Sequence, residues 1–257
     1  MSKSDAVAKI RPYTASDQKL VRFKLGQSNM EALANANNKT YFHPLTLAVW
    51  VALSGAFIQM MQWWPSSQYG ILSYLKPLPA FASTAVPVMF FVDWINRPYF
   101  EGLTQEVMRR PDVRDIEKHY FHDPASGFWL LEFGDKYIGL IAVDASQPSS
   151  KDKRNAAKAN GKTPKTATIR HFHVDDEFRK ANVQQDLLDY AVDHAFNKDP
   201  KLERIEVPDS PLIPYTRPTL RDKGFELDHH TQTVGILGWK MGTRYLKREK
   251  WSDSKKQ

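Results

Sequence analysis

Residues 168–196 read TIRHFHVDDEFRKANVQQDLLDYAVDHAF, and this stretch decides the fold. Thr168–Val174 combines β-branched and aromatic residues in the pattern of a strand. Ala181–Phe196 carries apolar side chains at helical spacing, which predicts an amphipathic helix. A strand that passes through a short polar turn into a helix indicates an α/β or α+β fold.

Further strands and helices are predicted on both sides of this unit. Two apolar runs around Gly134-Asp135 predict a β-hairpin, and Thr14–Asp17 has the composition of a helix start. The chain then predicts three layers around a mixed central sheet. The remaining expected elements are strands at 8–13, 128–133, 136–143, 204–207, 224–227 and 233–239, helices at 112–121 and 181–196, and an irregular segment at 212–223.

One segment differs in composition from the rest. Between Lys39 and Asp93 the only charged residue is Lys76, and Leu45–Trp64 has no charge over 20 residues. At about 1.5 Å per residue, such a helix crosses a hydrocarbon layer of about 30 Å. A second stretch, Leu78–Val92, is shorter and contains two prolines. Together they predict a membrane-embedded helical hairpin over residues 44–95; a buried hairpin in a soluble protein is the alternative.

The charges beside this hairpin predict its orientation. Residues 1–43 hold seven Lys and Arg against three acidic residues, whereas the connection between the apolar stretches has Lys76 alone. By the positive-inside tendency, both flanks face the cytosol. Six basic residues in the loop 146–166 and seven in 240–257 would favour anionic lipid, although solvated segments account for them equally well. No aromatic residues interleave these runs, so nucleic-acid binding is not predicted.

Composition excludes several classes of protein. The 257 residues contain no cysteine, which excludes a disulfide scaffold, a cysteine-rich zinc module and a thiol nucleophile. No nucleophile elbow, phosphate loop ending in Gly-Lys-Ser/Thr or dinucleotide glycine fingerprint is present. His171 and His173 have the spacing of two ligands on a strand face, but no further ligand pattern completes a metal site, and none is expected.

Several segments carry a resemblance to a known family. The chain resembles the GNAT N-acetyltransferases, and in particular their membrane-anchored camello-like branch, over about residues 8–240. The branch also places a hydrophobic anchor between its first two helices. The segments that carry the resemblance are Ile10–Tyr13 with Asp17, Asp112–Ile116 with Tyr120, Phe128-Trp129 with Glu132 and Gly139, the strand–turn–helix around Val174, and Gly224–Glu226.

The resemblance implies acetyl-CoA as cosubstrate and a set of site residues. The backbone of a loop at a helix N-terminus would hold the pyrophosphate, as orphan N–H groups and the helix dipole favour an anion. His171 lies where the branch tends to have a histidine that faces the substrate, so it is the candidate base; a histidine hydrogen-bonded within the sheet is the alternative. The implied cofactor residues are Val174, Arg179, Lys180, Ala181, Asn182, Val183 and Gln184.

Two positions depart from the pattern of the active family. The motif has glycine where this chain has Asn182, which tolerates left-handed backbone, and Gly or Ala where it has Gln184, whose long side chain could obstruct a phosphate. The family's general-acid tyrosine is replaced by Leu220, and Tyr215 is the candidate substitute. Whether the chain is an active enzyme is therefore open.

The sequence thus predicts four regions and two alternative functions. Residues 1–43 supply the first strand and helix, 44–95 the anchor, 96–245 the remaining domain and 246–257 a basic tail. The favoured function is transfer of acetyl from acetyl-CoA to a primary amine of a small conjugate or a protein, at the cytosolic face of the endoplasmic reticulum, with membrane lipid contacting residues 45–92. The alternative is a catalytically inactive GNAT-fold adaptor or chaperone for a membrane-protein partner, such as a transporter in that organelle.

Overall fold

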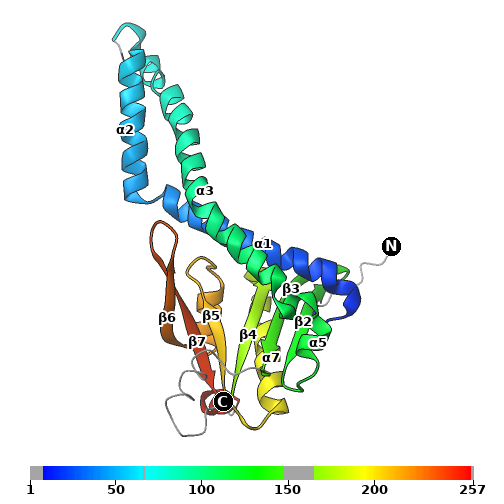
Figure 1. Ribbon diagram of the computed structural model, residues 1–257. Helices are drawn as coiled ribbons and strands as arrows, with labels where there is room; N and C mark the ends of the chain where they lie inside the picture. The colour runs from blue at the N-terminus through cyan, green and yellow to red at the C-terminus, as the bar shows by residue number, and fades with distance from the viewer. Residues whose placement is uncertain (1–7, 66, 147–164, 256–257) are drawn as a thin grey trace.

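The computed structural model describes residues 8–65, 67–146 and 165–255, and within that part of the chain a seven-stranded sheet carries the fold (Figure 1). The strand order is β1-β2-β3-β4-β5-β7-β6; β4 and β5 are parallel and the other neighbours are antiparallel. The expected mixed central sheet is confirmed. The strands are β1 (Ala8–Pro12), β2 (Gly127–Phe133), β3 (Lys136–Asp144), β4 (Lys165–Val174), β5 (Leu202–Asp209), β6 (Glu226–Val234) and β7 (Trp239–Lys247).

Helices cover both faces of this sheet. On one face, α1 and the C-terminal part of α3 pack with α4 and α5 over β2 and β3. On the other face, α7 packs on the central strands, and Trp251 of α9 stacks on Phe196 of α7. The helices are α1 (Gln18–Tyr41), α2 (Pro44–Met61), α3 (Leu78–Arg109), α4 (Pro111–Arg114), α5 (Ile116–Tyr120), α7 (Val183–Lys198), α8 (Thr216–Asp222) and α9 (Arg248–Ser254), with 3-10 turns η1 (Ala15–Asp17), η2 (Ser67–Leu75) and η3 (Asp176–Ala181).

The chain enters α1 through a well-formed helix start. The Asp17 carboxylate accepts hydrogen bonds from the backbone N–H and the hydroxyl of Thr14, and Arg11 donates two more from β1. These bonds lower the pKa of Asp17 to about 2, with Arg11 the largest cause. The predicted helix start at Thr14–Asp17 is confirmed.

An apolar helical hairpin projects from the domain, as expected (Figure 1). Two segments, Pro44–Met61 and Gly70–Arg109, are long and apolar enough to cross a membrane, with mean hydropathies of 1.6 and 1.5 over 18-residue windows. The expected boundary at residue 95 coincides with no helix end. Instead, α3 continues through Pro87 and Pro98 to Arg109, because its C-terminal half packs along α1.

Four details of the sequence prediction are corrected by the structure. The single helix expected at 112–121 is two short helices, because Asp115 leaves helical geometry and its side chain caps α5. Strand β5 continues through Pro208 to Asp209. Residues 233–239 are mainly a turn, and the second strand is Trp239–Lys247. Residues 246–254 end a strand and form α9, which packs on the domain, so they are not a tail. Most of the loop 146–166 lies outside the described residues.

Candidate active site

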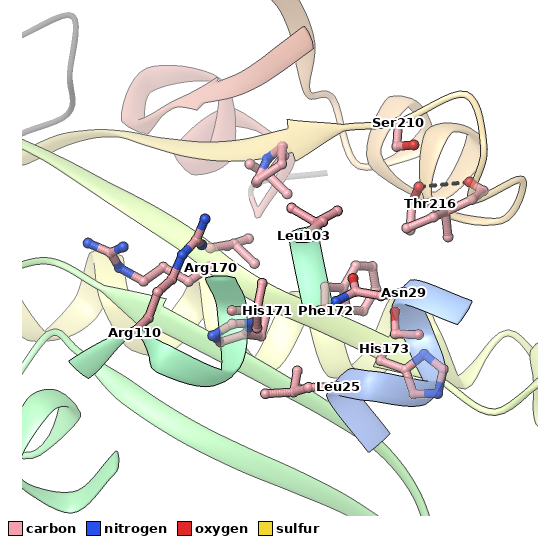
Figure 2. Close-up of a pocket in the computed structure, with 16 residues that line it drawn as sticks. Leu25, Asn29, Leu103, Arg110, Arg170, His171, Phe172, His173, Ser210 and Thr216 are labelled. Carbon is pink, nitrogen blue, oxygen red and sulfur yellow. Dashed lines mark hydrogen bonds between the residues drawn. The ribbon is translucent and has the colours of Figure 1, made fainter. Parts of the chain in front are cut away.

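The two parallel strands at the centre of the sheet separate and leave a cavity. Strand β4 pairs with β5 only over Lys165–Thr168, and beyond this point neither strand bonds to the other. A cavity of about 270 Å³ lies beside the separated segments, under α1 and α3 (Figure 2). Its wall combines strand residues 169–173 and 207–208 with residues of both helices and of the segment 210–216.

A bulge in β4 sets which side chains face the cavity. Ala142 of β3 pairs with His171 and Val143 pairs with Ile169, so Arg170 is an extra residue in β4. A bulge re-aims the side chains beside it. Arg170 and His171 consequently both lie on the side of α1 and α3, whereas Ile169 packs in the core beneath α7.

His171 forms a buried pair with a carboxylate. Its Nε2 lies 3.0 Å from Oδ2 of Asp112, and the Tyr120 hydroxyl donates to the same oxygen over 3.2 Å. Burial raises the pKa of Asp112, but the hydrogen bond and charge of His171 outweigh it and leave that pKa at about 2. An ionised Asp112 can only accept a hydrogen bond, so Nε2 carries the shared proton and Nδ1 is the ring nitrogen that can accept another.

A second histidine shares the cavity wall, which the alternation along β4 already indicated. Nε2 of His173 lies 3.2 Å from Oδ1 of Asp175, and Asp175 is also held by Lys24. Nδ1 of His173 is buried without a hydrogen-bond partner, as is Nδ2 of Asn29, which lines the same cavity. Buried polar atoms are normally paired. These two atoms lie at one end of the cavity, where a polar group of a ligand could form the hydrogen bonds that they lack (Figure 2).

The opposite end of the cavity is basic. Arg110 and Arg170 lie there, and no Asp or Glu lines the cavity among the described residues (Figure 2). Arg170 donates to Asp144 over 2.6 Å, and Nε2 of His119 lies 3.0 Å from the same carboxylate oxygen. Arg110 donates to Glu106 over 2.8 Å, so both arginines at this end are paired with carboxylates.

The segment expected to hold the pyrophosphate forms the turn from η3 into α7. Asn182 has φ 58° and ψ 19°, the left-handed conformation that its place in the motif requires. Lys180, Ala181 and Asn182 are exposed at the start of the helix. An exposed cation beside a helix N-terminus suits an anion.

Two side chains of this turn are bound to the protein itself. The amide of Gln184 is buried, donates to the Arg179 carbonyl over 3.2 Å and leaves its own oxygen unpaired. Arg179 makes two bonds of 2.6 and 2.7 Å to Glu31 of α1, and a third of 2.8 Å to the Val174 carbonyl. The N–H groups of Asn182 and Gln185 already bond within this turn, and the side chains of Arg179 and Gln184 must leave their present partners to contact a phosphate.

Tyr215 lies between this turn and the end of β4. Its hydroxyl accepts a hydrogen bond from the Val174 backbone N–H over 3.2 Å, and the Arg179 guanidinium lies 3.9 Å from its ring centre. Burial raises the pKa of Tyr215 well above its ordinary value, so the hydroxyl keeps its proton at neutral pH. Leu220, where the family has its tyrosine, is fully buried in the core beneath α7.

Of the expected site residues, the structure places His171 in the cavity wall and Val174, Arg179 and Tyr215 in one contact group beside it. Val183 packs against the core under α7, while Lys180 and Ala181 are exposed. Sequence reasoning missed Asp112, Asn29 and Glu31, which reach the site from helices distant in the chain. Among the described residues no group of three His, Asp or Glu side chains is placed to hold a metal ion.

Part of the chain is similar to a known protein family. Residues 88–212 match the model of the acetyltransferase (GNAT) family. The match runs from within α3 to just beyond β5, so it contains the bulged strand, the η3–α7 turn and most of the cavity wall. This part of the chain is therefore similar to the GNAT acetyltransferases. No curated protein sequence matches the chain.

Solved structures of the same class are similar in outline. An acetyltransferase of the GNAT family from Staphylococcus aureus is 11% identical, covers 94% of this chain and 99% of its own, and has a TM-score of 0.47. Spermidine N-acetyltransferase from Vibrio cholerae, in complex with CoA and spermine, is 13% identical, covers 95% and 98%, and also has a TM-score of 0.47. The functional inference therefore rests on the family match and on the geometry of this chain.

Proposed function

We propose that this protein is a membrane-anchored N-acetyltransferase that moves acetyl from acetyl-CoA to a primary amine. The observation that carries the proposal is the His171–Asp112 pair in the wall of a cavity at the β4–β5 separation, within the segment that matches the GNAT family. The cosubstrate would bind at the η3–α7 turn, through Lys180 and the backbone of 179–184.

His171 is proposed as the base. An amine attacks a thioester only after losing a proton, and a histidine oriented by a carboxylate accepts protons near neutral pH. Asp112 fixes the ring through Nε2, so Nδ1 is the atom that receives the proton. His173, paired with Asp175 and with an unpartnered Nδ1, is the second group in this wall that can bind or relay a proton.

Tyr215 is proposed to supply the proton that the leaving thiolate gains. Its raised pKa keeps the hydroxyl protonated, and its contact with the Val174 N–H fixes it at the end of β4. That N–H is also the donor that would stabilise negative charge on the reacting carbonyl oxygen once the tyrosine hydroxyl releases it.

The lining of the cavity favours one class of amine. Arg110 and Arg170 are each paired with a carboxylate that lies outside the cavity wall, and among the described residues no carboxylate lines the cavity to bind a polycation. We therefore propose an acceptor whose amine stands near an apolar or anionic group, as in a small conjugate or a protein segment, rather than a polyamine.

The hairpin of α2 and α3 is proposed as the membrane anchor, with lipid contacting residues 45–92. Its outward surface is apolar, with Val51 52% and Phe90 71% exposed, whereas its polar groups pair internally. Ser54 and Thr84 bond across the two helices over 2.6 Å, and the Trp50 ring N–H donates to the Phe81 carbonyl. Burying such surface in lipid is favourable, and satisfied polar groups are what a bilayer requires.

We further propose that the domain faces the cytosol at the endoplasmic reticulum, as acetyl-CoA is then directly available. A single Lys201→Cys variant tests the orientation, because the chain has no other thiol. The thiol should react with an impermeant maleimide added to intact, cytosol-side-out microsomes. Reaction only after the vesicles are opened would contradict the orientation.

The deciding experiment is calorimetric titration of acetyl-CoA into the detergent-solubilised full-length protein. Micromolar affinity, about −8 kcal/mol, is expected, followed by release of free CoA when amines are screened. Lys180→Glu should abolish binding through charge repulsion, whereas Lys136→Glu, at the exposed first residue of β3, should not. No binding at millimolar acetyl-CoA would overturn the proposal.

A second function is favoured by a specific observation at the turn. Arg179, Gln184 and the Val174 N–H, three groups that would serve the cosubstrate, are all bound within the chain. An inactive adaptor that holds a membrane-protein partner would keep such contacts permanently. It predicts no acetyl-CoA binding in the titration and crosslinking to a partner protein through the domain.

A further inference from the structure

The turn between β6 and β7 has a composition that solvent-exposed turns rarely have. Its sequence is Val234-Gly235-Ile236-Leu237-Gly238-Trp239, and the Gly238 N–H bonds to the Gly235 carbonyl, so Ile236 and Leu237 occupy the two central positions. Polar residues, Gly and Pro usually fill such positions. The side chain of Ile236 is 56% exposed.

The local structure holds these two residues at the tip. Gly235 and Gly238 both have positive φ, 71° and 66°, which commits the turn to this shape. A Cβ on Gly235 would lie 2.1 Å from the Trp239 ring, so the indole packs directly on this glycine. Trp239 also packs against the cluster formed by α1, α3 and Leu212, which fixes the turn to the rest of the domain.

The tip lies at the level where the apolar hairpin begins. The Gln232 side chain donates to the Tyr99 hydroxyl of α3 over 3.0 Å. From Gln232 the strand rises about 3.3 Å per residue, so the tip stands about 10 Å beyond Tyr99. Along α3, about 10 Å corresponds to about seven residues, so the tip lies at about the level of Val92, seven residues before Tyr99. In Figure 1 the tip points toward the junction of α1 and α2, where Phe42 and Leu45 are 72% and 67% exposed.

The charges at this level complement an anionic surface. Lys240 follows the turn and is exposed; Lys39, near the end of α1, is also exposed and donates to the Pro211 carbonyl over 2.6 Å. Long cationic side chains beside apolar residues at a membrane boundary reach for lipid head groups while the apolar residues enter the interface.

We propose that the β6–β7 turn is a second membrane contact, in which Ile236 and Leu237 enter the interfacial layer of the lipid bilayer beside the α2–α3 hairpin. The inference rests on the proposed anchor. With the hairpin as the only lipid contact, the hairpin and the domain together can tilt relative to the bilayer. A second contact at β6–β7 restrains that tilt and holds the cavity at a defined distance from the bilayer.

Depth-dependent quenching tests this placement, and the absence of cysteine makes single-site labelling straightforward. An environment-sensitive dye is attached to the single cysteine of three full-length variants, Ile236→Cys, Val51→Cys and Lys201→Cys. Each labelled variant is reconstituted in vesicles of phosphatidylcholine and phosphatidylserine. Val51 is exposed on α2, and Lys201 precedes β5 at the opposite end of the sheet. Nitroxide-bearing lipids should quench the dye at residues 236 and 51 but not at residue 201.

The outcomes separate this inference from the anchor. Quenching at residue 51 without quenching at 236 overturns the second contact and leaves the anchor standing. No quenching at residue 51 removes the anchor and the inference together. A dye at 236 that neither nitroxide lipid nor aqueous iodide reaches indicates a covering protein, which also overturns the lipid contact.

A matched pair of substitutions checks that the apolar tip causes the contact. A dye on Lys240→Cys reports on the turn without replacing its apolar residues. Adding Ile236→Asp should remove most of the lipid quenching, because a carboxylate resists transfer into the interface. Adding Leu227→Asp, at a 44%-exposed apolar residue near the other end of β6, should leave it unchanged. Equal quenching in both double variants would overturn the proposal.

Discussion

The two sides of the β4–β5 separation differ in whether their functional groups are free. On the side of α1 and α3 a cavity is open, and His173 and Asn29 carry buried polar atoms without partners. On the side of the η3–α7 turn, Arg179 and Gln184 are bound to the chain itself. The proposed acceptor side therefore has unpaired groups for a ligand, whereas the proposed cosubstrate side requires side chains to exchange partners.

This difference shows that a motif and its geometry can separate. Asn182 adopts the left-handed backbone that glycine favours, so it can replace the glycine expected at this position without changing the shape of the turn. Gln184, where a small residue is expected, differs through its side chain, which is buried and donates to the Arg179 carbonyl. Substitutions in the cavity and in the η3–α7 turn can therefore test whether the two sides differ in this way.

The largest effect on activity is expected in the cavity under α1 and α3. His171→Ala should lower kcat/KM by about 10²–10⁴-fold, since it removes the proposed base. CoA release with an accepted amine, at saturating acetyl-CoA, measures it. His229→Ala, on the exposed edge strand β6, is the control and should retain full activity. If His173→Ala is the more damaging change, the base is His173 and the assignment of His171 is wrong.

Tyr215→Phe tests the group between the two sides. The ring and its contact with Arg179 remain, but the proton donor is lost and the Val174 N–H loses its partner. We expect kcat to fall by about 10²-fold with little change in KM for the amine. Unchanged kcat together with tighter acetyl-CoA binding would mean that the hydroxyl obstructs the site rather than serving it.

Gln184→Gly tests the η3–α7 turn directly. Removing the amide opens the turn, so acetyl-CoA affinity should rise by about tenfold, or 1.4 kcal/mol, in calorimetry. Gln185→Gly, one residue further into α7 and half-buried, controls for the loss of helix propensity. Weaker binding in Gln184→Gly than in this control would show that the native amide contacts the ligand.

The smallest effect concerns stability at acid pH. The pKa of Asp112 falls from its ordinary 3.8 to about 2 in the folded protein. A carboxylate with a depressed pKa stabilises the fold above its unfolded pKa, and this contribution is lost as pH falls toward 2. Asp112→Asn should therefore reduce the loss of thermal stability between about pH 4 and pH 2. Circular dichroism measures it as the unfolding temperature at each pH. Asp135→Asn, at an exposed turn, should keep the native slope.

Sequence patterns predicted the elements well where the signal is local. The hairpin around Gly134-Asp135, the strand before Val174 and the α7 helix follow from periodicity and turn residues in neighbouring positions. The pattern failed at Ile236-Leu237, where two apolar residues predicted a strand but occupy a turn. The missed signal was the pair of flanking glycines, whose positive φ closes the turn.

The sequence by itself determined the apolar hairpin, the central strand–turn–helix and His171 as a candidate, because each depends on residues close together in the chain. Only the tertiary structure decided which groups meet: Asp112 with His171, Glu31 with Arg179 and Tyr215 with Val174 are separated by 41 to 148 residues. Their pairing depends on how α1, α3 and the bulged β4 pack together. Contacts of this kind determine whether a group is free for chemistry, and no local pattern encodes them.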